Sequence, residues 1–380
     1  MASVTVLDSA SLRRALDIRD LTDSAQGRHA MQLVVEDIER TLSELWKVPV
    51  LRHRLNPVVP VDDNYDRLRY APDAVARDIR YTRYLSPDVV LRTHTSAMIT
   101  PLLQRLSEEP PEDLLLSCPG IVYRRDAIDR THTGEPHQID LWRIRTARPS
   151  LGASNLEEMI GLVVEAALPG HSYRTLPAEH PYTLEGKEIE IQDGGRWLEI
   201  GECGLAHPEV LGSCGLPHRS SGLAMGLGLD RLLMVRKGLE DIRLLRATDP
   251  RIASQMLDPD PYRPVSRMPA VRRDISIAIS GEVDAERLGD AVRQALGRDA
   301  SSVESVEVVS ATLGRKLPIA ARERLGIAPD QWNVLLQIVL RDLDRTLTAE
   351  QANHLRDRIY AALHEGSVHQ WAVGDPSPEE

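Results

Sequence analysis

The chain has 380 residues, of which 42% are hydrophobic and 27% are charged, an ordinary composition for a globular protein. Its formal net charge of −11 excludes a surface that is basic all over, although a local basic face could still bind nucleic acid. No apolar run reaches membrane-spanning length. The three cysteines lack CxxC spacing, so we expect neither a zinc site nor a disulfide framework. These features predict a cytoplasmic protein of two domains, with no membrane contact.

Residues 1–26 predict a loosely attached N-terminal extension, and their aspartates argue against a transit peptide. Apolar residues recur at helical spacing between Arg28 and Lys47, which predicts a helix. A polar cluster, Leu91 to Ser96, then precedes a second helical stretch from Ala97 to Leu106.

The segment from Ile121 to Asp140 is the most informative part of the chain. Side chains alternate from Ile121 to Arg125, which predicts a half-buried strand, and Gly134 with Pro136 ends the pattern. A second strand would begin at His137. Such a hairpin places polar groups along one sheet face, where an arginine fork suits a phosphate or carboxylate. A solvated hairpin with scattered charges is the alternative interpretation of these residues alone.

Two later regions also have clear patterns. From Gly222 to Leu232 the glycines relieve crowding in a strand, and Arg231 opens a helix. After a proline-rich linker, the C-terminal part predicts a β-α-β-β-α-β ferredoxin-like unit. Its predicted elements are a strand through Ile275, Ile277 and Ile279, a helix from Asp284 to Leu296, strands near Val303–Val309 and at Trp332–Leu340, a helix from a Thr348/Gln351 capping box to Leu363, and a last strand at Val368–Val373.

The order of these motifs resembles the catalytic core of phenylalanyl-tRNA synthetases, a class II aminoacyl-tRNA synthetase family, over residues 30–255. The motifs are RTHTS from Arg92, YRRD from Tyr123 with a distal His137-Gln138, WLEI from Trp197 with CG and HP after it, and GLGLDRL from Gly226. VRRDIS and DRTLT in the C-terminal part resemble the ferredoxin-fold anticodon-binding domain of that family. Its place directly after the core resembles the single-chain, organellar form of the enzyme.

The resemblance implies an α+β fold. It consists of a class II synthetase antiparallel sheet core with helices, plus a C-terminal ferredoxin-like βαββαβ domain. We therefore expect an N-terminal extension at 1–26, the catalytic core at 27–250, a linker at 251–268 and the anticodon-binding domain at 269–380.

The implied activity is ATP-dependent activation of phenylalanine, or a close aromatic analogue, as an aminoacyl-adenylate, followed by transfer to tRNA. Both steps depend on positioning and on charge neutralisation, so arginines and Mg²⁺ are the expected tools. The expected ATP-binding residues are Arg124 at the α-phosphate, Arg231 at the γ-phosphate end, and Asp126, His132 and Pro136 near the triphosphate and adenine, with Glu199 on Mg²⁺. The catalytic residues would be Arg124 and Arg231. For His132 alone, a capping role in a turn is equally open.

The amino acid would be held by a second set of residues. The resemblance places His94, Ser96 and Gln138 at the substrate ammonium, with Asp140 supporting them, and His180, Tyr182, Glu202 and Ala224 around the side chain. The expected partners are the amino acid and a tRNA, with phenylalanine tRNA as the acceptor. A monomer is favoured, and a homodimer remains open.

Several positions depart from the family pattern. His180-Pro-Tyr182-Thr stands where the family has Phe-Pro-Phe-Thr, Ile99 replaces a glutamine, and Glu202 replaces a glycine. A carboxylate in an apolar pocket is costly unless it is paired, so Glu202 points away, pairs with His180, or meets a polar group on the substrate. The alternative function is thus a paralogue that activates a polar or hydroxylated phenylalanine analogue in biosynthesis or self-resistance. A non-catalytic tRNA-binding relative is a further alternative, against which the retained Arg124 and Arg231 argue.

The chain contains no phenylalanine, yet it contains nine tyrosines. A phenylalanine ligase without phenylalanine could be made when charged phenylalanine tRNA is scarce. It would also stay intact while a toxic analogue is incorporated at phenylalanine codons. Chance avoidance in a fold that tolerates tyrosine and leucine is the third explanation.

Overall fold

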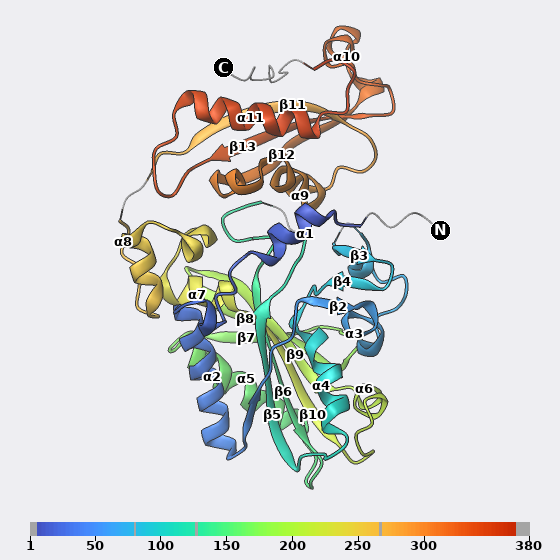
Figure 1. The fold of residues 1–380 in the computed structure, drawn as a ribbon, viewed down its shortest axis with the longest axis vertical. Coiled ribbons are helices and arrows are strands. Elements are labelled where there is room, and N and C mark those ends of the chain that lie inside the picture. The colour runs from blue at the N-terminus through green and yellow to red at the C-terminus, as the bar shows by residue number, and fades with distance from the viewer. Residues whose placement is uncertain (1–5, 80, 126–127, 266–267, 370–380) are drawn as a thin grey trace. The chain divides into compact units, whose positions relative to one another are not determined.

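The computed structural model describes residues 6–79, 81–125, 128–265 and 268–369. They form two compact units (Figure 1). The first unit contains residues up to Arg124, together with Glu135–Leu239 and Ser254–Arg263. The second contains the rest, including the short segment Arg125–Gly134. Both units combine helices with strands, so the α+β prediction is confirmed.

A seven-stranded sheet forms the centre of the first unit (Figure 1). Across the sheet the strands are β1 (Val50–Arg52), β5 (Asp113–Ile121), β6 (His137–Arg145), β10 (Ser221–Gly228), β9 (Arg196–Ala206), β8 (Thr183–Asp193) and β7 (Tyr173–Pro177). The β1–β5 pair is parallel and every other neighbouring pair is antiparallel. This is the predicted antiparallel core.

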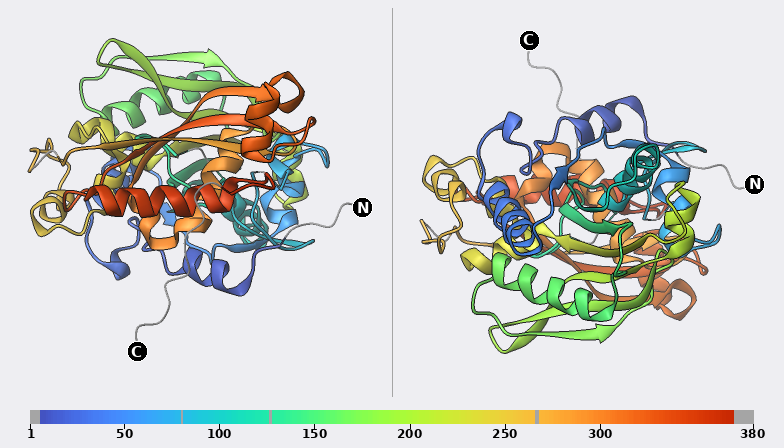
Figure 2. Two further views of the ribbon diagram at one scale, coloured as in Figure 1. Left: turned by 90° about the horizontal axis from the view of Figure 1, so that it is seen from above. Right: turned by 90° about the horizontal axis from the view of Figure 1, so that it is seen from below.

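The helices of the first unit lie on both faces of this sheet. Helices α2 (Ala30–Trp46), α5 (Ala153–Ala167) and α7 (Leu229–Lys237) cover one face, and α2 lies beside α5 in the view from below in Figure 2. On the other face, α4 (Ile99–Leu106) and α6 (Pro208–Ser213) join an apolar cluster around the fully buried Trp142. A separate three-stranded sheet consists of β2 (Val58–Pro60), β4 (Val89–Leu91) and β3 (Tyr84–Ser86), and α3 (Val61–Asn64) follows β2. Among the described residues, none of the helices is long and apolar enough to cross a membrane.

The N-terminal segment is not loosely attached, contrary to the prediction. Helix α1 (Ser9–Leu16) buries Ala15 in a cluster with Leu91, Ile121 and Tyr123. Leu21 is only 2% exposed. Two aspartates of this segment are hydrogen-bond acceptors: Asp8 caps α1, and the buried Asp20 accepts from the Thr22 amide. The domain limits at 26, 250 and 268 stay predictions.

The first strand of the predicted hairpin ends earlier than expected. Strand β5 pairs with β6 so that Ile121 lies opposite His137, and Val122–Arg125 are not in a strand. Ile121, Val122 and Tyr123 are all buried. The side chains therefore do not alternate between buried and exposed positions, as a half-buried strand would require. The Val122 and Tyr123 amides donate hydrogen bonds to the carbonyls of Pro136 and Arg92 (2.8 and 2.9 Å). The prediction of a strand over these residues is therefore wrong, and they form an extended connection.

The second unit has a three-stranded antiparallel sheet in the order β11, β13, β12. Its elements are β11 (Val271–Ile279), α9 (Ala285–Leu296), β12 (Val303–Leu313), α10 (Ile319–Leu325), β13 (Trp332–Leu340) and α11 (Ala349–Leu363), with the short α8 (Pro250–Ala253) before them. The predicted elements up to Leu363 are confirmed. So is the capping box, in which Thr348 Oγ1 accepts from the Gln351 amide (3.2 Å). Helix α10 was not predicted, and most of the predicted last strand, Val368–Val373, lies outside the described residues.

The segment after Arg124 packs into this second unit. Ile128 is 7% exposed and belongs to the apolar core that includes Ile275 and Leu336. Its carbonyl accepts a hydrogen bond from the Val306 amide (3.0 Å). Arg130 Nε donates to Glu304 Oε1 (2.7 Å). This part of the predicted nucleotide-binding hairpin is thus built into the core of the C-terminal unit.

Tyrosines take the large aromatic positions of a core that has no phenylalanine. Tyr65, Tyr123 and Tyr360 are among the largest fully buried side chains. Each brings a hydroxyl that needs a partner. The Tyr65 hydroxyl, for example, donates to the carbonyl of Ala76 (2.7 Å). The tyrosines therefore bring hydroxyl groups into the core that phenylalanine side chains would not bring.

Candidate active site

Three neighbouring strands of the large sheet form the floor of the candidate site. Strand alternation puts Asp140 of β6 on the same face as Gly226 of β10 and Glu202 of β9, since Gly226 lies opposite both acids in the register. Among the described residues, a side chain at Gly226 would have only Asp140 Oδ2 within 4 Å, at 3.7 Å from its Cβ. The floor between the two carboxylates is therefore open.

Asp140 is held rather than free. Thr95 Oγ1 donates to its Oδ2 (2.7 Å) and Trp142 Nε1 donates to its Oδ1 (3.1 Å). Burial raises the pKa of Asp140, and hydrogen bonds from Thr95, Ser96 and Trp142 offset part of that rise. Because both oxygens have partners, Asp140 is suited to orienting its neighbours. Its supporting role at a substrate ammonium stays a prediction.

Aromatic rings enclose one side of this floor. Tyr70 stacks on His94 with ring centroids 5.6 Å apart, and it lies 6.2 Å from the ring of Tyr182. Tyr182 in turn stacks on Trp142 at 6.1 Å. Burial raises the pKa of Tyr70 and of Tyr182 above the usual range, so both phenols stay neutral hydrogen-bonding groups. Together these rings make a wall suited to an aromatic side chain.

His94 lies between this wall and a positive charge. Neither ring nitrogen makes a well-formed hydrogen bond within the described residues, although the backbone of Asn64 approaches the ring. Burial, together with the charge of Arg124, lowers the pKa of His94 to about 4. The imidazole is therefore neutral near pH 7 and has nitrogens available to a polar ligand.

Glu202 pairs with His180. The distance from Glu202 Oε2 to His180 Nε2 is 2.6 Å, and the His180 ring lies 5.8 Å from the ring of Tyr182. The structure therefore selects the second of the three arrangements considered for Glu202. The pair places a polar group at the end of the aromatic wall.

A second group of charges lies along β9 and the start of α7. Arg231 Nη1 donates to the backbone carbonyl of Glu199 (2.6 Å) and lies 3.8 Å from its Oε2. Burial raises the pKa of Glu199, and Glu202 and Glu188 reinforce the rise, while Arg231 and Arg124 oppose it. The two predicted phosphate-binding arginines therefore act on the same carboxylate, so both lie near Glu199.

Some of the other predicted residues lie near Asp140 and the aromatic wall, and others do not. Ser96 is buried within hydrogen-bonding reach of Tyr182 and Asp140. Gln138 lies two residues before Asp140 on the same sheet face. Ala224 lies opposite Trp142 on that face. The remaining residues, on the ATP side, are less well placed. The Pro136 carbonyl accepts from the Val122 amide. His132 lies in a turn, where its Nδ1 is 2.7 Å from Asp129 Oδ2. Asp126 lies outside the described residues.

Sequence reasoning missed three residues that build the wall and the floor. Thr95 and Trp142 hold Asp140, and Tyr70 contacts both His94 and Tyr182. Trp142 could have been found, since strand alternation puts it two residues after Asp140 on the same face. Tyr70 precedes every recognised motif, and no pattern in the sequence marked it.

The comparison with protein families decides what this site belongs to. Residues 16–256 match the model described as "tRNA synthetases class II core domain (F)", and residues 266–368 match "Ferredoxin-fold anticodon binding domain". The chain belongs to the class II tRNA synthetases. It is thus a ligase-family protein with an anticodon-binding domain after its core.

Three relatives of this synthetase show how much of each chain is shared. The "Phenylalanine–tRNA ligase alpha subunit" of Prochlorococcus marinus (strain MIT 9313) is 37% identical over 62% of this chain and 69% of its own. The protein of the same name from Nostoc punctiforme is 38% identical over 50% of this chain and 56% of its own length. The "Probable phenylalanine–tRNA ligase, mitochondrial" of Drosophila melanogaster is 28% identical over 81% of this chain and 76% of its own. The synthetase therefore spans between about half and three quarters of these relatives.

A solved pyrrolysyl-tRNA synthetase from Desulfitobacterium hafniense aligns over 58% of this chain and 75% of its own, at 18% identity and a TM-score of 0.44.

The acids and arginines around Glu199 bear on the predicted Mg²⁺ site of the synthetase. No group of three potential metal-ligating side chains occurs within the described ranges. Glu199 is nevertheless an acid with a raised pKa beside two other acids, Glu188 and Glu202. Mg²⁺ is commonly held by one or two carboxylates plus substrate phosphates. Glu199 therefore stays the predicted ligand of Mg²⁺.

Proposed function

We propose that this synthetase activates phenylalanine with ATP and transfers it to phenylalanine tRNA. The observation that carries the proposal is the open floor at Gly226, which has the Thr95–Asp140 polar group on one side and the Tyr70–Tyr182 wall beside it. It offers polar contacts for an ammonium group next to a flat apolar surface for a ring. Relatives named for phenylalanine support the choice of amino acid.

In the first step, a carboxylate oxygen of phenylalanine attacks the α-phosphorus of ATP, and the bond to the pyrophosphate oxygen breaks. No protein nucleophile is needed, so the protein contributes position and charge. Arg124, whose charge is felt by His94 and Glu199, would bind the α-phosphate and the attacking carboxylate. Arg231 would hold the γ-phosphate end. Mg²⁺ held at Glu199 would supply further positive charge to the phosphates.

The ammonium group would be bound at the polar end of the floor. Ser96 and Gln138 would contact it, and Asp140 would keep these groups oriented through its bonds to Thr95 and Trp142. The neutral His94 would accept a hydrogen bond there. The ring would extend over Ala224 towards Tyr182, with the His180–Glu202 pair beyond it.

In the second step, a ribose hydroxyl at the tRNA end takes the acyl group from the adenylate and AMP leaves. The anticodon-binding domain supports tRNA as the partner, and the proposed acceptor is phenylalanine tRNA. We further propose that the synthetase works as a monomer in a reducing compartment such as the cytoplasm, where its three buried cysteines stay as thiols. The mitochondrial relative leaves an organelle open.

Pyrophosphate exchange with ATP and Mg²⁺ tests the proposal. The panel would contain phenylalanine, tyrosine, meta-tyrosine, β-hydroxyphenylalanine and the other standard amino acids. We expect the highest rate with phenylalanine, and charging of a phenylalanine tRNA transcript by the same preparation. Arg124→Ala should lower both rates by roughly a hundred- to a thousandfold, while Arg196→Ala, which removes a 67% exposed side chain, should leave both near the wild-type values.

Two results would overturn it. Exchange that is strongest with a polar analogue would favour the paralogue alternative, which the names of the relatives do not support. Exchange with no amino acid would favour a non-catalytic tRNA-binding protein.

A further inference from the structure

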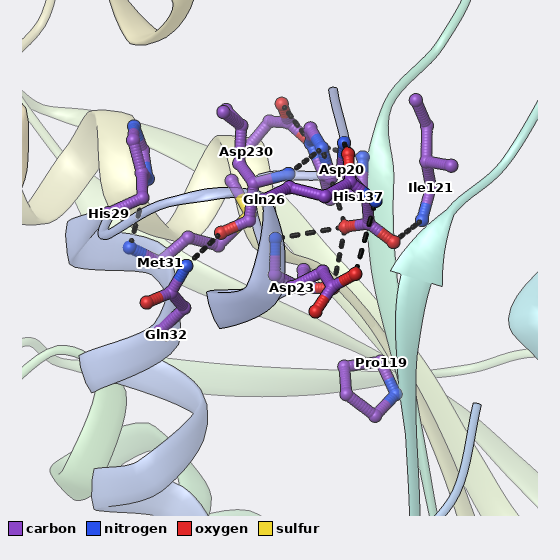
Figure 3. Close-up of polar contacts among 12 residues, drawn as sticks. Asp20, Asp23, Gln26, His29, Met31, Gln32, Pro119, Ile121, His137 and Asp230 are labelled. Atoms are coloured by element: carbon purple, nitrogen blue, oxygen red, sulfur yellow. Dashed lines mark hydrogen bonds and ion pairs between the residues drawn. The ribbon is translucent and has the colours of Figure 1, made fainter. Parts of the chain in front are cut away.

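The N-terminal segment contacts His137, the first residue of β6, on the sheet face opposite to Asp140. The backbone N–H of Leu21 donates a hydrogen bond to Nε2 of His137 (3.0 Å). Figure 3 shows His137 next to Asp20 and Asp230. His137 is fully buried and Leu21 is 2% exposed. Because Nε2 accepts this bond, it carries no proton, and the imidazole proton lies on Nδ1.

The protonated nitrogen faces an acid on a different element. His137 Nδ1 lies 3.1 Å from Oδ1 and 3.2 Å from Oδ2 of Asp230. The backbone N–H of His137 also donates to Asp230 Oδ2. Asp230 lies in the first turn of α7 and is 4% exposed, a position where the helix dipole favours a carboxylate. Asp230 therefore clamps the start of β6 to the start of α7.

Asp20 fixes the segment that supplies the Leu21 donor. Its carboxylate accepts from the amide and hydroxyl of Thr22 (2.9 and 2.6 Å) and from the amide of Ile121 (3.3 Å), and it lies 3.4 Å from Arg54. Its own backbone N–H donates to Gln26 (2.9 Å). The buried turn at Asp20–Thr22 is thus tied to the end of β5 and to the segment that follows β1, which leaves Leu21 little freedom to move.

The two residues that this network joins are each next to a residue of the proposed site. Gln138 follows His137 and Arg231 follows Asp230. In the sheet, Gln138 lies opposite Gly228, the last residue before α7. His137 points to the face away from Asp140, since strand side chains alternate. Leu21, His137 and Asp230 therefore do not touch substrate, but they set where the amino-acid side and the ATP side of the site lie relative to each other.

We propose that Leu21, His137 and Asp230 are positioning residues. The N-terminal segment fixes the His137 tautomer, His137 holds Asp230, and the joined pair keeps Gln138 and Arg231 in register for the reaction. The proposal rests on the proposed function, because it assigns Gln138 to the amino acid and Arg231 to ATP.

Pyrophosphate exchange, with separate KM values for ATP and for phenylalanine, tests the network in the full-length protein. The variants are Asp230→Asn, His137→Gln and Leu21→Pro, of which the last removes the donor N–H and keeps an apolar residue. Asp23→Asn is the matched control. It alters a cap in the same segment, where Asp23 accepts from the Ala25 amide (3.0 Å) without touching His137.

We expect Asp230→Asn and His137→Gln each to lower kcat/KM for both substrates by roughly ten- to a hundredfold, since small displacements of positioned groups have effects of that size. Leu21→Pro should also lower kcat/KM for both substrates. The Leu21→Pro/His137→Gln double variant should be no worse than the more damaging single variant, because both act through one bond. Asp23→Asn should stay within twofold of the wild type.

A purely structural role would give a different result. The melting temperature would fall, while both KM values and kcat below that temperature would stay within twofold of the wild type, which would overturn the proposal. So would additive effects of Leu21→Pro and His137→Gln. If the wild type exchanges with no amino acid, the proposed function fails by itself. The network is then judged by calorimetry with ATP and Mg²⁺, where Leu21→Pro and Asp230→Asn should each weaken binding at least tenfold and an unchanged affinity would refute it.

Discussion

The His180–Glu202 pair should weaken discrimination between phenylalanine and tyrosine. The change to test is the double replacement His180→Phe/Glu202→Met, which removes both polar groups and keeps side-chain volume. A hydroxyl on the substrate ring could hydrogen-bond to the pair, and an apolar wall would offer it no partner. The double variant should therefore prefer phenylalanine more strongly than the wild type does.

The structure sets the size of this effect. The distance between His180 Nε2 and Glu202 Oε2 is 2.6 Å, and the His180 and Glu202 side chains are 12% and 41% exposed. A hydrogen bond to a charged group contributes about 1.5–3 kcal/mol, and we take about 1 kcal/mol because the solvent reaches Glu202. That energy corresponds to about fivefold in kcat/KM. An apolar pocket rejects an added hydroxyl by about a hundredfold, so we expect the wild type to prefer phenylalanine by about twentyfold.

The assay is pyrophosphate exchange with each amino acid, and the quantity compared is the ratio of the two kcat/KM values. The ratio should rise about fivefold in the double variant, with an intermediate value for His180→Phe alone. Glu179→Gln is the control, because it removes an exposed carboxylate next to His180 and should leave the ratio unchanged. The reasoning is refuted if the double variant keeps the wild-type ratio, or if kcat/KM falls equally for both amino acids.

Three further predictions concern charge and packing. Arg124→Ala and Arg231→Ala should each lower kcat by roughly a hundred- to a thousandfold in pyrophosphate exchange, because each removes a charge that stabilises the transition state. The pKa of His94 is lowered to about 4, so the unfolded state binds more protons than the folded state between about pH 6.5 and 4. The free energy of unfolding should therefore fall as the pH falls through that window. His94→Gln should flatten the dependence of the melting temperature on pH. Ile128→Ala should lower the free energy of unfolding of the second unit by about 2–4 kcal/mol because Ile128 is 7% exposed, measured by denaturant unfolding, whereas Val309→Ala, at a 52% exposed position, should change it little.

The ferredoxin-like unit was predictable because its local patterns agree with its fold. Alternating isoleucines mark β11, and the Thr348/Gln351 capping box marks the start of α11. In the first unit, β5 was missed although it is nine residues long. All its side chains after Asp113 are buried and its run contains Pro119 and Gly120, so no alternation of apolar and polar residues reveals it.

The residues at the candidate site divide in the same way. Those inside short motifs, such as His94 and Arg231, were named from the sequence. The wall residue Tyr70 and the donor Leu21 were not, because each is brought to the site by contacts between segments far apart in the chain. For Leu21 the donor is a backbone N–H, which every residue other than proline has. No pattern of side chains could have indicated it.

The network of Leu21, His137 and Asp230 also affects how the chain folds as it leaves the ribosome. Leu21 is separated from His137 by 116 residues, and His137 from Asp230 by a further 93. At about 5–20 residues per second, the network is complete roughly 10–40 s after Leu21 itself has been made. Until His137 is made the Leu21 N–H lacks its acceptor, and until Asp230 is made that acceptor lacks the carboxylate that holds it. Nascent chains that end before Asp230 are thus the stage of synthesis at which we expect chaperones to bind.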